Sequence, residues 1–388
     1  MRCERWTPAV LLVGFVGFLL VLMGVGVSCA AEPLKIGAIF SITGPASFLG
    51  EPERNTAKML EEDLNKSGGI KGHKVEVIVY DDESDATKAV TAVDRLIKRD
   101  KVLAVIGPST SGSTLAIIPK IEEAQIPLLS CAAARKITEP PRRWVFKVAA
   151  SDLLAVQKIF GDLKRQNRTK VAILTASDAY GAGGREDIKA LAPQVGISIV
   201  ADEVFGPKDT DMTAQLTRIK GTTAQALVVW GTNPGPAVIA RNRMQLKITL
   251  PLYMSSGVAS KKFIELAGPE NAEGILLPAG RLIIADQLPA TNPQKTLLLD
   301  YIKNYESKFK QPVSTFGGHA WDAMTLATQV VRDGAAVEAP AIRDAIEKVK
   351  GFVGTGGVFS FSPTDHSGLT EEAFALVRIT KGDWQLQQ

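Results

Sequence analysis

Apolar and polar positions along the chain follow the order strand, helix, strand, helix. Apolar runs and period-two alternation predict four buried strands in the first third of the mature sequence, at residues 35–40, 74–80, 102–106 and 126–130. Helical spacing of apolar residues predicts helices at 55–66, from the acidic segment 81–85 to residue 97, and from residue 115 onward. The turn-rich segment 41–52 is expected to be a loop.

The same alternation restarts after residue 150 and predicts a second unit of similar size. Its helices are expected at 152–165, 184–195, 212–219, 236–244 and 261–267, and its strands at 170–174, 197–204, 226–230, 252–254 and 275–277. Three more helices (295–310, 319–332, 339–350) and two late strands (359–361, 374–379) complete the pattern. The predicted fold class is therefore α/β, with two doubly wound, Rossmann-like lobes of mainly parallel sheet that face each other across a ligand cleft.

Segment 102–119, VLAVIGPSTSGSTLAIIP, contains the strongest local signal for a binding site. A buried strand leads through a turn rich in hydroxyl groups into the start of a helix, and that turn includes Ser111. Because the first N–H groups of a helix lack partners, this geometry suits a small anion such as a carboxylate. A helix cap with no ligand is the alternative interpretation. The phosphate-binding P-loop lysine and the dinucleotide G-x-G-x-x-G pattern are both absent from this segment.

The N-terminus predicts export. Arg2 and Arg5 precede an apolar stretch at 10–27, and small residues follow it up to Ala31, as in a signal peptide covering residues 1–31. An uncleaved anchor and lipidation through Cys29 are the alternatives. The net charge is only +4, and the charged residues are interspersed along the chain without a basic cluster, which does not favour nucleic acid as a partner.

Catalytic and metal-binding patterns are missing from the sequence. Cys131 is the one cysteine certain to belong to the mature chain, and it is expected to be a buried, inert thiol. The three histidines lack a second ligand at metal spacing, and no G-x-S-x-G nucleophile turn occurs. We therefore expect neither an enzyme nor a cofactor or metal site.

Short motifs occur in a characteristic order along the mature chain: IGAIFSITGPASFLG at 36–50, GGIKG at 68–72, YDD at 80–82, VIG at 105–107 with Ser111, DAYG at 178–181 and AEG at 272–274. Together they resemble the periplasmic leucine/isoleucine/valine-binding proteins, which are the solute-binding components of ABC importers. The resemblance implies the type I binding-protein fold, a periplasmic location, a monomer and an ABC permease as partner.

That resemblance also implies how the lobes divide. Lobe 1 is expected to comprise residues 32–149 and 279–369, and lobe 2 residues 150–278 and 370–388. The chain would then cross between the lobes three times, near 148–151, 277–279 and 368–371.

Several ligand-binding residues follow from the resemblance. Ser111 matches the hydroxyl that binds the ligand carboxylate, and Tyr180 matches the aromatic side chain of the second lobe that closes on the ligand. Other positions of the family site fall at Phe48, Leu49, Ala132, Ala134, Thr232 or Asn233 (where the family has an aromatic residue), Ser256 and Gly257. Ala134 lacks the usual threonine hydroxyl, and Leu49, with Phe48 beside it, stands in place of the usual tryptophan.

Ser256 occupies the position where the family has an acidic partner for the ligand ammonium. Burying an ammonium without a carboxylate partner is costly. The sequence therefore favours an aromatic or aliphatic acid over a branched-chain amino acid as ligand. A ligand sensor of the same fold that regulates a partner protein is the alternative function.

Overall fold

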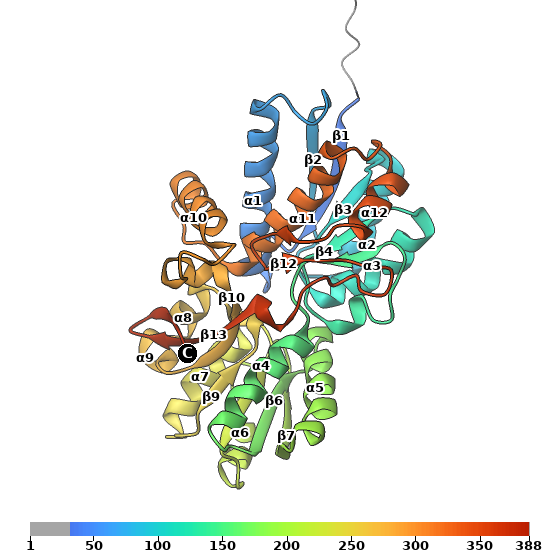
Figure 1. Cartoon of the computed structure of the whole chain (residues 1–388). Helices are drawn as coiled ribbons and strands as arrows, with labels where there is room; N and C mark the ends of the chain where they lie inside the picture. The colour runs from blue at the N-terminus through green and yellow to red at the C-terminus, as the bar shows by residue number, and fades with distance from the viewer. Residues whose placement is uncertain (1–31, 388) are drawn as a thin grey trace, which may run out of the picture.

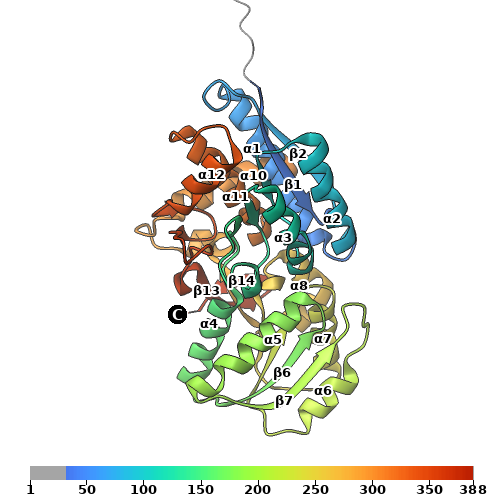
Figure 2. The same ribbon diagram turned by 90° about the vertical axis from the view of Figure 1, so that its right-hand side faces the viewer.

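The computed structural model describes residues 32–387. The signal peptide predicted at residues 1–31, including Cys29, lies outside the described residues. Two open sheets form the centres of two lobes, one above the other in Figure 1, and Figure 2 shows the same arrangement from the side. No helix within 32–387 combines the length and the apolar character needed to cross a membrane.

The first sheet is entirely parallel and has the strand order β2-β1-β3-β4-β5. Its strands are β1 (Leu34–Phe40), β2 (Val75–Asp81), β3 (Ala104–Ile106), β4 (Leu128–Ser130) and β5 (Val145–Lys147). Helices α1 (Ser47–Lys66), α2 (Ala86–Arg95) and α3 (Ser111–Ala124) connect them. Strand β5 is an addition to the sequence prediction, because the apolar residues 144–146 lie between Arg142-Arg143 and Lys147 and form no extended apolar run.

The second sheet has the order β14-β13-β10-β9-β8-β6-β7. Parallel pairing joins β6 (Lys170–Ala176), β7 (Ser198–Phe205), β8 (Ala226–Trp230), β9 (Leu252–Met254) and β10 (Leu276–Gly280). Strands β13 (Phe374–Thr380) and β14 (Asp383–Leu386) add an antiparallel edge. The helices of this lobe are α4 (Asp152–Arg165), α5 (Ala179–Leu191), α6 (Thr213–Lys220), α7 (Gly235–Gln245), α8 (Lys261–Ala267) and α9 (Pro269–Ala272).

The C-terminal third of the chain returns to the first lobe before it joins the second sheet. Helices α10 (Lys295–Phe309), α11 (Thr315–Arg332) and α12 (Ala339–Glu347) precede a two-stranded sheet of β11 (Phe352–Val353) and β12 (Val358–Phe359). Helix α11 packs along α1, as Figure 1 shows. This return brings residues near 316 next to residues near 48.

Several helices begin earlier than the sequence predicts: α3 starts at Ser111 and α11 at Thr315, each four residues early, and α1 and α5 differ most. Helix α1 starts at Ser47 rather than at residue 55 and runs through Pro52, and Gly50 lies so close to Ser41 that a Cβ there would be 2.3 Å from the Ser41 carbonyl oxygen. Helix α5 starts at Ala179 rather than at 184, with Asp178 as its N-cap. The local signals of proline and glycine suggested loops at both places, but tertiary packing of the helices outweighs these preferences.

The chain passes between the sheets in three places. The first passage links β5 to α4, the second follows β10, and the third leads from β12 to β13. Residues 277–279, expected at a hinge, lie inside β10, which pairs with β9 and with β13 as far as Gly280. The second passage therefore begins after Gly280.

Two buried ionisable side chains flank the first passage. Lys147 at the end of β5 and Asp152 at the start of α4 are both fully buried. The Lys147 ammonium donates to the carbonyl oxygen of Ala133 at 3.0 Å. Burial lowers the pKa of Lys147 and raises that of Asp152, so each group is shifted towards its neutral form.

Candidate functional site

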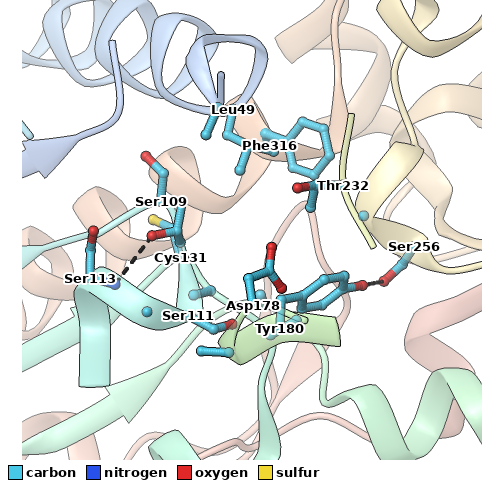
Figure 3. Close-up of a pocket in the computed structure, with 18 of the residues that line it drawn as sticks. Leu49, Ser109, Ser111, Ser113, Cys131, Asp178, Tyr180, Thr232, Ser256 and Phe316 are labelled. Carbon is cyan, nitrogen blue, oxygen red and sulfur yellow. Dashed lines mark hydrogen bonds between the residues drawn. The ribbon is translucent and has the colours of Figure 1, made fainter. Parts of the chain in front are cut away.

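A cavity of about 340 Å³ lies between the lobes, where the carboxyl ends of strands from both sheets meet. The first lobe contributes residues that follow β1, β3 and β4, and the second lobe contributes residues that follow β6, β8 and β9. Open parallel sheets place ligands at this end of their strands. Figure 3 shows the side chains that converge on the cavity from the two sides.

The N-terminus of α3 forms one wall of the cavity. Thr110 caps the helix by accepting the Ser113 N–H at 3.2 Å, as the alternative interpretation of this turn required. Among the described residues, the N–H groups of Ser111 and Gly112 have no hydrogen-bond partner, and both residues line the cavity. The turn therefore combines a helix cap with two backbone N–H groups that, within the described chain, face the cavity without a partner, which is the arrangement that an anion site requires.

Ser111 is held in place by the chain that follows β4. The Ala134 N–H donates to the Ser111 hydroxyl oxygen at 3.3 Å, which leaves the Ser111 proton free. The Ala132 N–H is also engaged, because it donates to the Ser130 hydroxyl at 3.1 Å. The N–H groups of residues 132 and 134 are thus both used inside the protein.

The N-terminus of α5 faces α3 from the second lobe. Among residues 32–387, the N–H groups of Ala179 and Tyr180 lack partners, whereas the Gly181 N–H is capped by Asp178 at 2.8 Å. A Cβ built on Gly112 would lie 3.8 Å from the Cβ of Ala179, so the two helix ends nearly touch. Both helix dipoles therefore favour negative charge in the same part of the cavity.

Tyr180 and Ser256 meet at the second-lobe side of the cavity (Figure 3). Their hydroxyl oxygens are 3.5 Å apart. Tyr180 is only 8% exposed, and burial raises the pKa of its phenol well above the ordinary value, so the group stays neutral. Gly257 lies against the Tyr180 ring, since a Cβ there would be 2.8 Å from Tyr180 Cε1.

Within residues 32–387, Asp178 is the single acidic residue that lines the cavity. Figure 3 shows its carboxylate pointing into the enclosed space. One carboxylate oxygen caps α5, and the side chain is partly exposed. Sequence reasoning had not selected this residue, although its position as a helix N-cap is visible in the motif DAYG.

Much of the remaining wall is apolar. Leu49 from α1, Phe205 from β7 and Phe316 from α11 line it together with several alanines. The Phe48 ring packs edge-to-face on Phe316, with centroids 5.6 Å apart. Phe48 thus supports the wall from behind instead of lining it.

His319, one turn after Phe316 on α11, also lines the cavity. Its Nδ1 is buried without a hydrogen-bond partner among the described residues. Burial lowers the pKa of the imidazole to about 4, so His319 is neutral at physiological pH. Cys131 lines the cavity as well, and burial raises the pKa of its thiol well above 9.0, so the thiol stays protonated.

Most residues selected from the sequence come together in this cavity. Those that line it are Leu49, Ser111, Ala132, Tyr180, Asn233, Ser256 and Gly257. Phe48 and Ala134 lie outside the lining, the first packed on Phe316 and the second behind Ser111. Phe316 and His319 were missed because they follow the other site residues by many positions in sequence, and no local pattern marks them.

Comparison with known proteins gives a consistent result. A model of the periplasmic binding protein family matches residues 33–383. The Leucine-, isoleucine-, valine-, threonine-, and alanine-binding protein of Pseudomonas aeruginosa is 24% identical over 348 residues, which is 89% of this chain and 88% of the relative.

Solved structures agree with this comparison. An extracellular ligand-binding receptor from Rhodopseudomonas palustris HaA2 superimposes with a TM-score of 0.85 and 29% identity, over 92% of this chain and 99% of that one. The substrate-binding protein LivJ of a Streptococcus pneumoniae branched-chain amino acid transporter, solved with isoleucine, has a TM-score of 0.80 and 27% identity, over 91% and 98% of the two chains.

Proposed function

Because the chain belongs to the periplasmic binding protein family, we propose that it is the solute-binding component of an ABC importer that carries a small carboxylate. The observation that supports this most directly is the pair of helix N-termini, α3 and α5, that face each other across the cavity. Each presents free N–H groups, and Ser111 adds a hydroxyl proton. A carboxylate has enough lone pairs to accept from all of them.

The same arrangement links binding to closure of the lobes. Ser111 and Gly112 belong to the first lobe, whereas Ala179 and Tyr180 belong to the second. A ligand that contacts both sets is bound more tightly by the closed form than by the open form, so it shifts the population towards closure. The permease would recognise the closed form through surfaces of both lobes.

We infer further that the ligand is an aromatic or aliphatic acid without an ammonium group. Ser256 offers a hydroxyl at the position where the resemblance placed an acidic partner, and that hydroxyl lies beside Tyr180. A hydroxyl carries no charge to offset a buried ammonium, which costs several kcal/mol when it is left unpaired. The apolar wall around Leu49 and Phe316 suits a ring or a branched chain.

Asp178 supports a second candidate, an α-amino acid. Its carboxylate is in the cavity and one of its oxygens is not engaged in the α5 cap. Asp178, instead of a residue at position 256, would then be the acidic partner of the ligand ammonium. The relatives are named for amino acid binding, which agrees with this candidate.

A thermal-shift panel separates the two candidates. The panel contains leucine, isoleucine, benzoate, 4-hydroxybenzoate and 3-methylbutanoate, each tested on the wild type and on Asp178→Asn. A ligand at 100 times its Kd stabilises the native state by about 2.7 kcal/mol. Shifts from the acids that survive Asp178→Asn support an acid ligand. Shifts from leucine that disappear in Asp178→Asn support the amino acid candidate instead. If no compound of the panel shifts the unfolding temperature, carboxylate binding is contradicted.

Export and attachment are further parts of the proposal. Residues 1–31 would direct the chain across the membrane, with lipidation at Cys29 as the alternative to cleavage. The mass of the mature protein purified from cells distinguishes the two. Transport and sensing differ in the partner, and loss of ligand uptake in a deletion strain would identify transport.

A further inference from the structure

A buried carboxyl group lies directly behind the anion-binding turn. Glu53 on α1 is 1% exposed and accepts a hydrogen bond from the hydroxyl of Ser109. Ser109 follows β3 and lines the cavity two residues before Ser111. The Ser109 hydroxyl oxygen also accepts the Ser41 N–H at 3.0 Å. Ser109 therefore connects the cavity to a titratable group that no ligand can reach.

The single proton of the Ser109 hydroxyl can serve only one acceptor at a time. A serine hydroxyl has one proton and two acceptor lone pairs. When Glu53 is ionised, its carboxylate accepts the hydrogen bond from the Ser109 hydroxyl, so Ser109 cannot donate to a ligand. When Glu53 is protonated, its own O–H can donate to Ser109. The two lone pairs of Ser109 then accept from Glu53 and Ser41, and the Ser109 proton is free to turn to the cavity.

The surroundings of Glu53 favour the protonated state. Burial raises the pKa of Glu53 well above 4.5, the Ser109 hydrogen bond opposes the shift, and the charge of Asp82 adds to it. Asp82, in the loop after β2, is fully buried, and its Oδ1 accepts the Ser41 hydroxyl at 2.6 Å. Its Oδ2 has no hydrogen-bond partner within residues 32–387.

Other titratable groups face this region from the neighbouring elements. Cys131 follows β4, and burial raises the pKa of its thiol, so it stays protonated and uncharged. Helix α11, packed along α1, carries His319, which is neutral, and Asp322, whose pKa burial raises to about 7. Tyr301 on α10 bonds Thr56 at 2.7 Å and stays protonated, because burial raises the pKa of its phenol. None of these groups supplies a cation to keep Glu53 ionised.

We propose that Ser109 is a second hydroxyl donor to the ligand carboxylate, available only while Glu53 holds a proton, so that ligand binding is coupled to proton uptake. The coupling rests on the carboxylate ligand proposed above. The proton comes from solvent and moves to Glu53, and in the complex Glu53 donates to Ser109, which donates to the ligand. The only covalent changes are the O–H bond that forms on Glu53 and the O–H bond that breaks in the hydronium ion that supplies the proton.

The coupling predicts the direction of the pH dependence. A ligand anion at Ser109 stabilises the protonated form of Glu53, so its pKa is higher in the complex than in the free protein. Between these two pKa values the affinity falls as pH rises, at most tenfold per pH unit. Binding in that interval takes up at most one proton.

Two measurements on the wild type test the coupling. The Kd of the acid that gives the largest shift in the panel is measured from pH 5.5 to 9. Calorimetry in phosphate and in Tris then measures proton uptake from the different ionisation enthalpies of the buffers. We expect weaker binding at higher pH and a positive proton uptake. An affinity and heat that do not depend on pH or buffer would overturn the coupling.

Variants then assign the proton. Glu53→Gln is expected to bind with an affinity independent of pH. Ser109→Ala is expected to bind roughly tenfold more weakly at pH 6 and also to lose the pH dependence. Asp322→Asn removes another buried carboxyl with a pKa near this range and is expected to keep the pH dependence. If the pH dependence of the affinity persists in Glu53→Gln, or disappears only in Asp322→Asn, the assignment of the proton to Glu53 is wrong.

Failure of the coupling can be told apart from failure of the proposed function. Absence of binding by every acid at every pH contradicts the carboxylate ligand itself, and the coupling fails with it. Tight binding of an acid without proton uptake contradicts the coupling alone. Because proton uptake is measured on the wild type, this test does not depend on whether Glu53→Gln folds.

Discussion

The N–H of Ala134 donates to the hydroxyl oxygen of Ser111 across 3.3 Å. This bond joins the segment after β4 to the first residue of α3 and sets the direction of the remaining Ser111 proton. A hydroxyl that already accepts from the backbone has its proton available for a ligand. Ala134 therefore acts on the site through Ser111, without lining the cavity itself.

Replacing Ser111 by alanine is expected to weaken binding of the ligand carboxylate by about 1–3 kcal/mol, because a hydrogen bond to a charged group is lost. Isothermal titration calorimetry on the wild type and the variant measures the loss. Ser307→Ala is the control, since Ser307 is an exposed serine of α10 that does not line the cavity. Equal affinities of Ser111→Ala and Ser307→Ala would remove Ser111 from the binding site.

Replacing Gly257 by alanine is expected to weaken binding while leaving the fold intact. The added Cβ would lie 2.8 Å from Tyr180 Cε1 and 3.1 Å from the Gly231 carbonyl oxygen, so the Tyr180 ring must shift. Overpacking of this kind costs about 1–3 kcal/mol. Gly161→Ala, where the added Cβ meets no atom within 4 Å and the residue does not line the cavity, is the control. An unchanged Kd in Gly257→Ala would show that the position of Tyr180 is unimportant for binding.

Replacing Gly184 by alanine is expected to lower the free energy of unfolding by about 1–3 kcal/mol or more. The new Cβ would lie 2.2 Å from Trp230 Cδ1, and Trp230 is fully buried and cannot move aside. Gly161→Ala in the exposed part of α4 meets no atom within 4 Å and is expected to gain about 0.5–1 kcal/mol from helix propensity. Chemical denaturation of both variants gives the comparison, and equal stabilities would contradict this account of α5 packing.

Asp322 is expected to make stability fall as pH rises from about 4 to about 7. Burial raises its folded pKa from 3.8 to about 7, so in this interval the folded state holds a proton that the unfolded state has lost. The stabilisation is fully present below the unfolded pKa and is lost as pH rises through the folded pKa.

Unfolding temperatures of the ligand-free protein at pH 5 and pH 8 measure this effect. In Asp322→Asn the unfolding temperatures at pH 5 and pH 8 are expected to differ less than in the wild type. The variant is also expected to be less stable at both pH values, because Asp322 accepts the N–H groups of Thr355 at 2.6 Å and Gly356 at 2.8 Å. If the unfolding temperature differs between pH 5 and pH 8 by the same amount in the wild type and in Asp322→Asn, other carboxyl groups cause the effect.

The sequence predicted much of the fold because burial leaves a regular pattern. Strand β8 and helix α4 occur where apolar periodicity placed them, since their buried residues repeat with the period of the element. Strand β5 and the first turns of α1 are among the elements that were missed. Charged residues lie on both sides of the apolar residues of β5, and α1 begins in a segment that contains Pro52.

The candidate site was predictable only where chemistry and local structure coincide. The hydroxyl-rich turn around Ser111 precedes a helix in the sequence itself, so an anion site was expected there. Asp178 was visible as a helix cap, but that its carboxylate points into the cavity is a tertiary fact. Phe316 and His319 reach the cavity because α11 packs along α1, a contact between distant segments.

The amino-acid sequence by itself determined two α/β units, a hydroxyl-rich turn at Ser111 that leads into a helix and an uncharged residue at Ser256, because each depends on neighbouring residues alone. The tertiary structure decided that the ends of α3 and α5 face each other and that Glu53 lies behind Ser109. These relationships depend on how separate elements pack, and packing brings together groups that no local pattern relates. The availability of the Ser109 proton is therefore a property of the folded chain.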